Sequence, residues 1–419
     1  MKVLWILNMV LPYVAKELKF NTSFSGGWLV DYSKKLGADN DFEIATMTYA
    51  NVKEYTDITV DNVRNFIFPG AGKRLLFTSE KTLEDCKKVI EEFKPDLIHI
   101  HGTEYSIAYS ILNVCGDIPV LLTIQGILTR ISQEYYGGLS LSEILKIGTV
   151  KDWLKFRTPF CAKQLFLKNA KRERYVLRHI KYVTGRTDWD MSVMHAINNK
   201  LKYFRHNYNL REEFYDAGKW NADEMEPHAI FAGASLYTLK GFHVVLDALK
   251  IVKESYPDVK LYMPGIDNDR IRSKSANSYH RFIVKKIDKL GLNDNICFIG
   301  RKNASDIAEI LRKANVCVVS SAIEGASATV CEAMMIGTPC ICPYRGGMTE
   351  LLKDGISGFY YDFPEYSVLA TRIKQLFLDV ELCKRFSEKV KADAEIRHNR
   401  EKNYSELTQI YKHVLMGEK

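Results

Sequence analysis

The alternation of short apolar runs with longer amphipathic stretches is the feature that most restricts how this chain can fold. Apolar runs at 3–10, 42–49 and 96–102 are separated by stretches of helical periodicity at 27–36 and 79–93. This β-α-β-α order predicts parallel strands in a sheet that carries helices on both faces. We therefore expect an α/β fold with a doubly wound sheet.

A second series with the same order begins near residue 228. Its predicted strands lie at 228–235, 259–265, 295–300, 316–321 and 339–344, and its predicted helices at 241–255, 279–290, 304–313, 330–336 and 348–352. With 419 residues, the chain is long enough for two domains of ordinary size. We expect Rossmann-like domains at 1–210 and 211–395, and a C-terminal helix at 396–419 that packs on the first domain. Ligands of such sheets bind outside the carboxyl ends of the strands, in the cleft between the domains.

A basic, aromatic-containing stretch interrupts the first series. The segment at about 128–180 is expected to form helices within or against the first domain. Residues 151–205 hold 14 lysines and arginines against 4 acidic residues, a local net charge of +10 in a chain whose total is +8. Such a segment faces nucleic acid, an anionic membrane or an anionic substrate, or else is a solvated helix face.

The cysteines and the N-terminus indicate where the protein works. The nine cysteines lack the paired spacing of a disulfide framework or zinc site, so we expect reduced core residues and a cytoplasmic protein. Asn8 and Pro12 interrupt the first apolar run, which favours a buried strand over a signal peptide. No run approaches the roughly 18 to 20 apolar residues that span a bilayer, so any membrane contact is expected to be peripheral, at the inner face.

The passage from 316 to 352 carries the most chemical information. A predicted strand ends at Ser320, small residues follow Glu324, and a helix carrying Glu332 begins near Thr329. The small residues are Gly325, Ala326, Ser327 and Ala328. Backbone amides before a helix N-terminus favour a phosphate, and ionised carboxylates are strong acceptors for sugar hydroxyls. On spacing alone, either glutamate is equally a surface residue or a helix cap.

This passage resembles the nucleotide-sugar site of the retaining GT-B glycosyltransferases of the GT4 family, whose E-x7-E motif is matched by Glu324 and Glu332. The likeness extends to a Gly-Gly-x-x-Glu turn at 346–350 and a DGxxGF segment at 354–359. It covers most of the second half of the chain and, more loosely, the first half. The resemblance implies a GT-B fold of two Rossmann-like domains across a cleft. It also implies transfer of a hexose-type sugar from a nucleoside diphosphate sugar to a hydroxyl of a glycan or lipid-linked acceptor, as in surface polysaccharide synthesis.

The resemblance assigns roles to both glutamates and to the first loop of the second half. Glu324 would hold hydroxyls of the transferred sugar, Glu332 would bind the ribose, and the amides at 325–328 would meet the diphosphate. The sequence GASLYTLKG is similar to the family's Gly-Arg-Leu loop and Lys-Gly pair, so Lys240 would stabilise the leaving diphosphate. In the same loop, Gly233 and Ser235 are expected to line the donor site. Ala234 and Ser235 stand where the family has arginine. Arg301, which follows a later strand, is either a replacement for that arginine or a surface residue.

Two glycines and a histidine are the first candidates in the first half. Gly26 and Gly27 open a predicted helix where the family's glycine pair approaches donor phosphate or acceptor, although glycine pairs also simply make turns. His99 and His101 share one face of a strand, with His101 nearest its tip. By resemblance, we expect His101 to be a catalytic residue in the cleft, while its alternative is a satisfied core histidine.

Gln125 and Arg186 follow later strands of the same series. Gln125 stands where the family often has a histidine that contacts the sugar, and it forms hydrogen bonds but cannot titrate. Arg186 is expected to bind an anionic group of donor or acceptor. Asp188 and Asp190 have a spacing that suits either a metal or a helix cap, and we favour the cap. The expected reaction requires no cofactor or metal, since Lys240 and a helix N-terminus neutralise the leaving group.

Three other classes of function compete with this reading. A dinucleotide-dependent oxidoreductase requires a G-x-G-x-x-G fingerprint after a strand, and the sequence has none. An epimerase or phosphorylase of the GT-B type, or a catalytically silent nucleotide-sugar-binding relative, shares the architecture. A nucleic-acid-binding module is suggested by charge alone, and the expected partners do not include nucleic acid.

Overall fold

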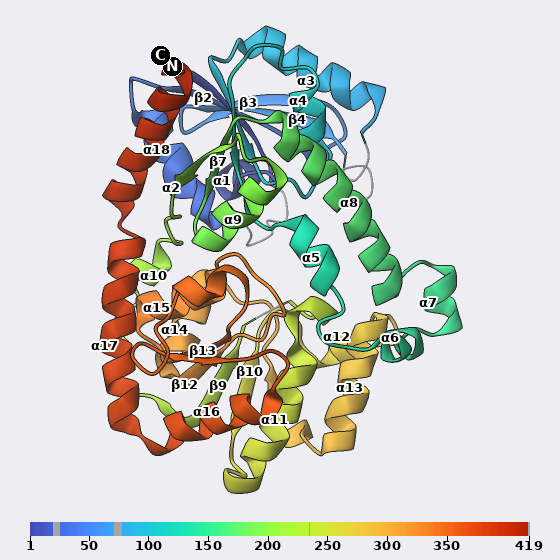
Figure 1. Ribbon diagram of the computed structural model, residues 1–419, viewed down its shortest axis with the longest axis vertical. Helices are drawn as coiled ribbons and strands as arrows, with labels where there is room; N and C mark the ends of the chain where they lie inside the picture. The colour runs from blue at the N-terminus through green and yellow to red at the C-terminus, as the bar shows by residue number, and fades with distance from the viewer. Residues whose placement is uncertain (20–25, 71–77, 234, 418–419) are drawn as a thin grey trace. The chain divides into compact units, whose positions relative to one another are not determined.

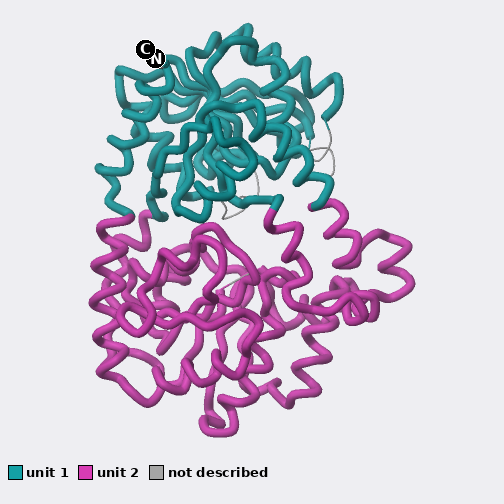
Figure 2. Tube along the Cα trace, in the orientation of Figure 1, with its two compact units in different colours: residues 1–129, 167–211, 398–419 teal, residues 130–166, 212–397 magenta. Residues whose placement is uncertain are grey.

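The computed structural model describes residues 1–19, 26–70, 78–233 and 235–417 (Figure 1). Two compact units divide the chain (Figure 2). Unit 1 consists of Met1–Thr129, Leu167–Arg211 and His398–Lys419, and unit 2 consists of Arg130–Phe166 and Glu212–Arg397. The main division, after Arg211, lies one residue from the expected boundary.

Unit 1 is built on one mostly parallel sheet. In the described part of the chain its strand order is β3-β4-β2-β1-β5-β6-β7-β8. The strands are β1 (Lys2–Ile6), β2 (Glu43–Ala50), β3 (Thr56–Val60), β4 (Val63–Pro69), β5 (Leu97–His101), β6 (Val120–Thr123), β7 (Tyr182–Gly185) and β8 (Lys202–Arg205). Strand β1 is central because β2 pairs with one edge of it and β5 with the other.

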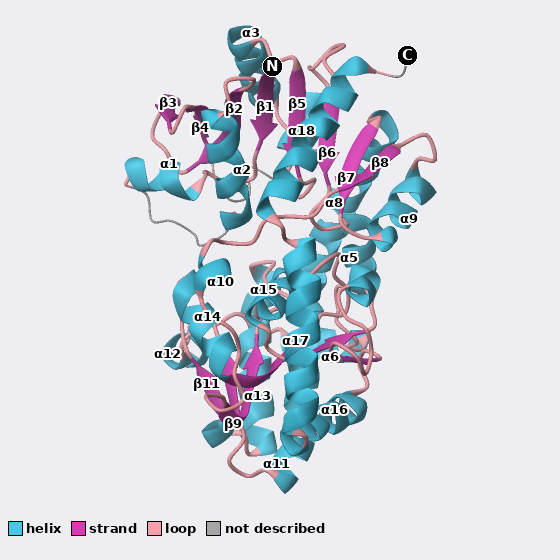
Figure 3. Cartoon of the chain, turned by 90° about the vertical axis from the view of Figure 1, so that its left-hand side faces the viewer, coloured by secondary structure: helices cyan, strands magenta, loops and turns pink. Residues whose placement is uncertain are grey.

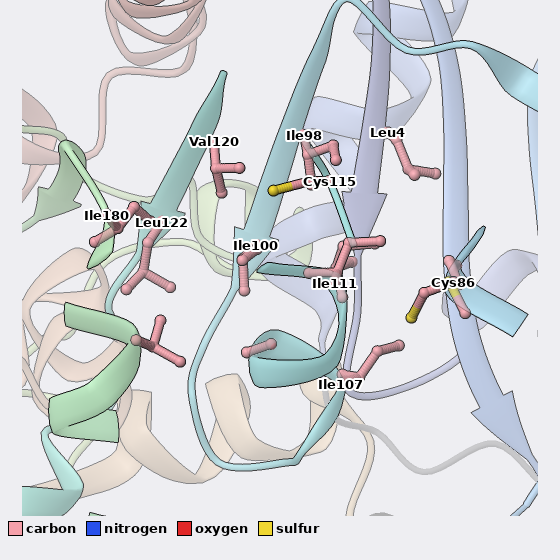
Figure 4. Close-up of a cluster of buried hydrophobic side chains, with 14 of the residues drawn as sticks. Leu4, Cys86, Ile98, Ile100, Ile107, Ile111, Cys115, Val120, Leu122 and Ile180 are labelled. Carbon is pink, nitrogen blue, oxygen red and sulfur yellow. The ribbon is translucent and has the colours of Figure 1, made fainter. Parts of the chain in front are cut away.

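Helices cover both faces of this sheet, as the βα alternation predicts. They are α1 (Pro12–Glu17), α2 (Gly27–Ala38), α3 (Glu80–Phe93), α4 (Ile107–Leu112), α5 (Leu128–Glu134), α8 (Pro159–His179), α9 (Asp188–Ile197) and α18 (Arg400–Met416), with α5 and α8 each shared with unit 2. Successive side chains of β1 belong to opposite cores: Leu4 packs with Ile107 of α4 (Figure 4), and Trp5 packs with Tyr411 of α18. Burial on both faces explains why β1 reads as a continuous apolar run.

The terminal helix packs on unit 1, in agreement with the expected arrangement. Figure 3 shows α18 across the face of the sheet beside β1 and β5. The Tyr411 hydroxyl accepts a hydrogen bond from Trp5 Nε1 at 2.9 Å and lies 2.7 Å from His99 Nδ1. This buried polar contact joins residues more than 300 positions apart and fixes the register of the helix on the sheet.

An antiparallel edge hairpin in unit 1 was not predicted. Strand β3 pairs antiparallel with β4, and the two residues between them, Asp61 and Asn62, have φ values of 49° and 61°. Two consecutive left-handed residues make the tight turn that matches strand twist, and Asp and Asn tolerate that conformation. The Asp-Asn pair between two β-branched runs was the available signal.

Unit 2 is a wholly parallel doubly wound sheet. Its strands, within the described residues, follow the order β11-β10-β9-β12-β13-β14. They are β9 (Glu226–Ala232), β10 (Lys260–Met263), β11 (Ile296–Phe298), β12 (Ala314–Val318), β13 (Cys340–Pro343) and β14 (Phe359–Tyr361). The helices are α6 (Leu141–Ile147), α7 (Val150–Leu154), α10 (Glu213–Asp216), α11 (Phe242–Ser255), α12 (Asn268–Arg272), α13 (Ser278–Leu290), α14 (Ala304–Lys313), α15 (Ala328–Ile336), α16 (Tyr366–Leu378) and α17 (Val380–Arg397).

The inserted basic segment is divided differently from the expectation. We placed 128–180 with the first domain, but Arg130–Phe166 belongs to unit 2. The reason is a set of specific contacts, in which Thr238 Oγ1 donates to the Tyr135 carbonyl at 2.6 Å and His243 Nε2 lies 2.9 Å from the Gly137 carbonyl. Helical and basic character did not specify which surface the segment would pack on.

Two further findings bear on the sequence expectations. All nine cysteines are free, and seven of them are buried. Among the helices of the described chain, none combines the length and apolar character that crossing a bilayer requires.

Candidate functional site

The first part of the candidate site lies at the switch point of the unit 2 sheet. Strands β9 and β12 are neighbours there, and the chain winds away from them in opposite directions. Ligands of doubly wound sheets bind at this point, beyond the carboxyl ends of the strands. The loop after β9 leads to Lys240, and the loop after β12 carries Glu324. The Ala322 amide donates to the Leu239 carbonyl at 2.8 Å, so backbone contact joins the two loops.

Lys240 and Glu324 form a salt bridge at this position. Their side chains are 19% and 21% exposed, so both are held by the protein yet reachable by a ligand. Ser321 Oγ donates to Glu324 Oε1 at 2.8 Å, and Ser320 Oγ donates to the Lys240 carbonyl at 2.8 Å. The structure thus brings together two residues that the sequence places 84 positions apart.

The charge of Lys240 is secured by its surroundings. Burial alone lowers the pKa of this ammonium group, but the Glu324 carboxylate and the Tyr237 hydroxyl outweigh it and raise the pKa above its ordinary value. The Tyr237 ring also lies 5.8 Å from the Lys240 nitrogen. Lys240 is therefore a cation throughout the neutral pH range.

The loop after Glu324 ends in a helix N-terminus. Helix α15 begins at Ala328, with Ser327 as its N-cap, close to the predicted start. Gly325, Ala326 and Ser327 are buried, and the Ser327 side chain makes no capping hydrogen bond. The amide groups of a helix N-terminus favour an anion. Glu332 lies on α15 and is half-buried.

A second turn fixes the position of Glu324. The Gly347 amide donates to the Glu324 carbonyl at 2.9 Å. Gly346 has a φ of 61°, and a Cβ there would come within 2.2 Å of the same carbonyl oxygen. The Gly-Gly-x-x-Glu turn therefore supports the glutamate loop by close backbone approach, which only glycine permits.

The other predicted residues of unit 2 are less closely tied to the pair. Gly233 approaches the start of α15, because a Cβ there would lie 2.5 Å from Thr329 Cγ2. Ser235 and Arg301 are exposed, and Ala234 lies outside the described residues. Nothing in the described contacts joins Arg301 to Lys240 or Glu324.

The second part of the candidate site lies at the corresponding switch point of unit 1, between β1 and β5. Asn8 follows β1 and donates through Nδ2 to Glu104 Oε2 at 3.0 Å, and the Gly126 amide donates to Glu104 Oε1 at 3.3 Å. Gly102 has a φ of 94°, and a Cβ there would lie 2.1 Å from Glu104 Oε2. The glycine after His101 thus allows the carboxylate to fold back over the strand end.

Glu104 was missed by the sequence analysis, although it lies three residues beyond the predicted His101. A carboxylate just after a strand that ends at a switch point was the available signal. Burial raises the pKa of Glu104 to about 7, and the negative charge of Glu173 adds to this effect. The side chain is only partly covered, so solvent or a ligand reaches it.

The two histidines of β5 differ in their bonding. Both ring nitrogens of His99 have a partner: Nδ1 lies 2.7 Å from Tyr411 Oη, and Nε2 lies 2.7 Å from Thr123 Oγ1. His101 is 4% exposed, and neither ring nitrogen has a hydrogen-bond partner among the described residues. Burial, with a contribution from His206, lowers the pKa of His101 to about 3, so the ring is neutral. His101 is thus buried at the end of β5, and it retains two unused polar atoms.

Arg186 and Gln125 lie close together in unit 1. Arg186 Nη2 donates to the Gln125 carbonyl at 3.2 Å, and the guanidinium lies 4.3 Å from the centre of the Tyr208 ring. Tyr208 stacks on Trp28, with ring centres 4.5 Å apart. Arg186, Gln125, Tyr208 and Trp28 thus form one polar and aromatic cluster in unit 1.

The remaining sequence candidates of unit 1 lie at the starts of α2 and α9. Helix α2 begins at Gly27 as predicted, and a Cβ on Gly26 would lie 2.3 Å from the Met9 sulfur. Asp190 accepts a hydrogen bond from the Arg186 amide at 2.9 Å, and Asp188 forms a salt bridge with Arg205 at 3.0 Å. The two aspartates thus bond to separate partners at the start of α9.

Replacing Glu104 by glutamine is expected to stabilise unit 1 relative to the wild type as the pH rises. The folded pKa of Glu104 lies above the unfolded value of 4.5, so its ionisation costs stability between pH 4.5 and about 7. Between pH 5 and pH 8, the difference in the free energy of unfolding between the variant and the wild type should change by about 1 to 3 kcal/mol, because the side chain keeps some solvent contact. Denaturant unfolding at pH 5 and pH 8 measures it, and an unchanged difference contradicts the raised pKa.

Known proteins support the class that this fold and site define. Residues 196–393 match the family described as glycosyl transferases group 1. The chain is 25% identical over 335 residues to the putative glycosyltransferase EpsD of Bacillus subtilis, covering 78% of each chain. It is also 25% identical over 358 residues to the uncharacterized glycosyltransferase MJ1178 of Methanocaldococcus jannaschii, covering 84% of each.

Solved structures show the same architecture. Sucrose-phosphate synthase from Thermosynechococcus elongatus superposes with a TM-score of 0.72 at 16% identity, over 98% of both chains. Anabaena HepE in complex with UDP and glucose superposes with a TM-score of 0.68 at 16% identity, over 98% of this chain and 99% of HepE. The protein is therefore a glycosyltransferase with the GT-B fold. Its residues 196–393, which contain Lys240, Glu324 and Glu332, form the part that matches the group 1 family.

Proposed function

We propose that the protein is a retaining glycosyltransferase that moves a hexose-type sugar from a nucleoside diphosphate sugar to a hydroxyl group. The observation that carries this proposal is the Lys240–Glu324 pair beside the start of α15. A cation and a helix N-terminus suit the diphosphate, and the carboxylate suits sugar hydroxyls. The complex of HepE with UDP and glucose is in keeping with such a donor.

The proposed reaction breaks the bond between the anomeric carbon and the diphosphate oxygen, whose electron pair leaves with the nucleotide. Lys240 and the amides at 325–328 stabilise the negative charge that develops on that oxygen. The acceptor oxygen bonds to the anomeric carbon on the face that the diphosphate leaves, and its proton passes to the departing phosphate. Because Lys240 and the helix N-terminus supply positive potential, the proposal requires no resident metal.

The acceptor is proposed to bind through unit 1. Glu104 offers a partly exposed carboxylate, and Trp28 and Tyr208 offer partly exposed, stacked rings, while His101 lies buried beside Trp28 with unused ring nitrogens. Arg186 adds a cation beside them for an anionic acceptor group. This combination suits a glycan or a lipid-linked sugar, and we extend the proposal to surface polysaccharide synthesis on that basis.

Nucleoside diphosphate binding tests the donor half of the proposal. We expect one of UDP, GDP and ADP to raise the thermal midpoint of the wild type, since a ligand at 100 times its dissociation constant stabilises by about 2.7 kcal/mol. Glu332→Ala should lose most of this shift, whereas Glu388→Ala, which changes an exposed glutamate of α17, should retain it.

The same assay distinguishes the competing functions. A shift with NAD or an oligonucleotide, and none with a nucleoside diphosphate, contradicts the proposal. Donor binding without transfer to any hydroxyl acceptor instead favours an epimerase or a silent relative. The configuration of the product, read by NMR from the anomeric coupling, tests retention directly.

A further inference from the structure

Helices α6 and α7 carry an unusual concentration of exposed apolar side chains. Among the described residues fourteen large hydrophobic side chains are exposed, and five of them lie within 141–156. We call these five the outer apolar face: Leu141, Leu145, Val150, Leu154 and Phe156. Val150, Leu154 and Phe156 are each 75% to 78% exposed, which is far more than a residue at the margin of a core. Contiguous exposed apolar patches mark interaction surfaces, and these five exposed side chains come from one segment of 16 residues, 141–156.

The helical spacing shows that this face is separate from the core. Leu141 and Leu145 lie four residues apart on α6, and Val150 and Leu154 lie four apart on α7, so each pair shares one side of its helix. On the other side of α6, Ile144 is fully buried. Helix α6 is thus apolar on two sides, of which only one is needed for folding.

The segment is firmly attached to unit 2 through its inner side. Asp152 forms a salt bridge with Arg281 of α13, and Ser278 Oγ donates to the Arg157 carbonyl at 3.2 Å. Capping boxes close the start of both helices, at Ser140 with Glu143 and at Thr149 with Asp152. The outer apolar face is therefore held on a defined scaffold, and α7 lies at the right-hand margin of unit 2 in Figure 1.

Exposed cations lie among these apolar residues. Lys146, Lys151 and Lys155 are exposed, and none forms a salt bridge with any described residue. Of the two acids in the same stretch, Asp152 pairs with Arg281, whereas Glu143 accepts from the neutral Ser140 and keeps its charge. Three lysines against one glutamate leave 3 − 1 = +2, so the face combines apolar side chains with net positive charge and is complementary to a surface that is both apolar and anionic.

We propose that the outer apolar face docks unit 2 onto an anionic lipid membrane. Leu154, Phe156 and Val150 enter the boundary between head groups and acyl chains, and the neighbouring lysines contact anionic head groups. Short amphipathic helices with large apolar side chains and lysines bind membranes in this way, through apolar burial together with attraction to anionic lipid. This inference does not depend on which sugar or acceptor the enzyme uses.

The charge pattern favours a membrane over a second copy of this chain. Two copies meeting through this face would place Lys146, Lys151 and Lys155 against the same lysines, and juxtaposed like charges oppose association. An anionic bilayer instead offers the opposite charge beside hydrocarbon. From the sequence, we placed the basic segment at 128–180 with the first domain. The proposed docking surface lies instead in Arg130–Phe166, the part of that segment that belongs to unit 2.

Vesicle co-sedimentation of the full-length protein tests this proposal. The probes are phosphatidylcholine vesicles with and without about half phosphatidylglycerol. We expect binding to the anionic vesicles at least tenfold tighter than to the zwitterionic ones. Leu154→Ser combined with Phe156→Ser should weaken binding at least tenfold, as should Lys151→Glu combined with Lys155→Glu. Leu378→Ser, which removes an equally exposed leucine of α16, should leave binding within about twofold.

The outcomes distinguish the apolar from the electrostatic contribution to membrane binding, and they distinguish a membrane from a second copy of the chain. Raising the salt from about 0.1 M to about 0.5 M should weaken wild-type binding, because exposed charges are screened. All variants change exposed side chains, so thermal unfolding should show midpoints close to the wild type. Absence of vesicle binding, or binding that the Leu154 and Phe156 substitutions leave intact, overturns the proposal. So does concentration-dependent dimerisation that these same substitutions abolish, since a second copy would then cover the face.

Discussion

Replacing Lys240 by alanine is expected to lower kcat by about 10²- to 10³-fold, the effect of removing one preorganised group that stabilises a developing anion. Lys240 holds its charge because Glu324 and Tyr237 raise its pKa, and it lies beside the loop that leads to α15. The cation acts on charge that grows as the bond to the diphosphate breaks, so kcat should fall more than donor affinity. Steady-state kinetics with varied donor, with nucleotide release as the readout, measures both.

A matched control separates chemistry from charge and stability. Lys250→Ala removes an exposed lysine of α11 whose nearest acidic partner, Glu254, is 3.9 Å away. We expect kcat to stay within about twofold and stability within about 0.5 kcal/mol of the wild type. If Lys240→Ala and Lys250→Ala have equal kcat, Lys240 does not stabilise the leaving group.

Replacing Glu173 by alanine is expected to lower the free energy of unfolding of unit 1 by about 3 to 5 kcal/mol. The side chain of Glu173 on α8 is fully buried. Its carboxylate accepts hydrogen bonds from Thr103 Oγ1, the Leu128 amide, and both the amide and Oγ1 of Thr129, at 2.7 to 2.9 Å. Alanine removes the acceptor of all four hydrogen bonds, two of which come from donors on the buried residues Thr103 and Leu128.

Denaturant unfolding followed by far-ultraviolet circular dichroism measures this loss. Arg178→Ala, at an exposed position of the same helix, should change the free energy of unfolding by no more than about 0.5 kcal/mol. A loss below about 1 kcal/mol for Glu173→Ala would show that water replaces the carboxylate. The result also bears on the site, because Glu173 anchors Thr103, the neighbour of Glu104, to the start of α5.

Much of the architecture follows from local sequence pattern. The predicted helices at 304–313 and 279–290 coincide with α14 and nearly with α13, since apolar residues recur at helical spacing in both and an Asn N-cap fixes the start of each. Strands buried on both faces were equally readable as apolar runs. Edge strand β3 escaped prediction because it is half-exposed and lacks such a run.

The candidate site was predictable where its residues are close together in the sequence, and it was missed where they are far apart. Glu324, the small-residue loop and the start of α15 form one continuous segment, so their order along the chain implies their arrangement. Glu104 was missed because its significance comes from Asn8 and Gly126, which lie 96 and 22 residues away. His101 was correctly placed at the end of β5, but its burial depends on Trp5 and Trp28, which no local pattern specifies.

The sequence by itself determined the alternating elements, the two parallel sheets and the position of the E-x7-E segment, because hydrophobic periodicity and turn residues act over short distances. Only the tertiary structure decided that Arg130–Phe166 packs on unit 2, that Tyr411 reaches His99, and that Lys240 pairs with Glu324. Each of these depends on a few polar contacts between residues far apart in the chain. Such contacts depend on complementary surfaces in three dimensions. The order of residue types along the chain is compatible with many other pairings, so it does not predict them.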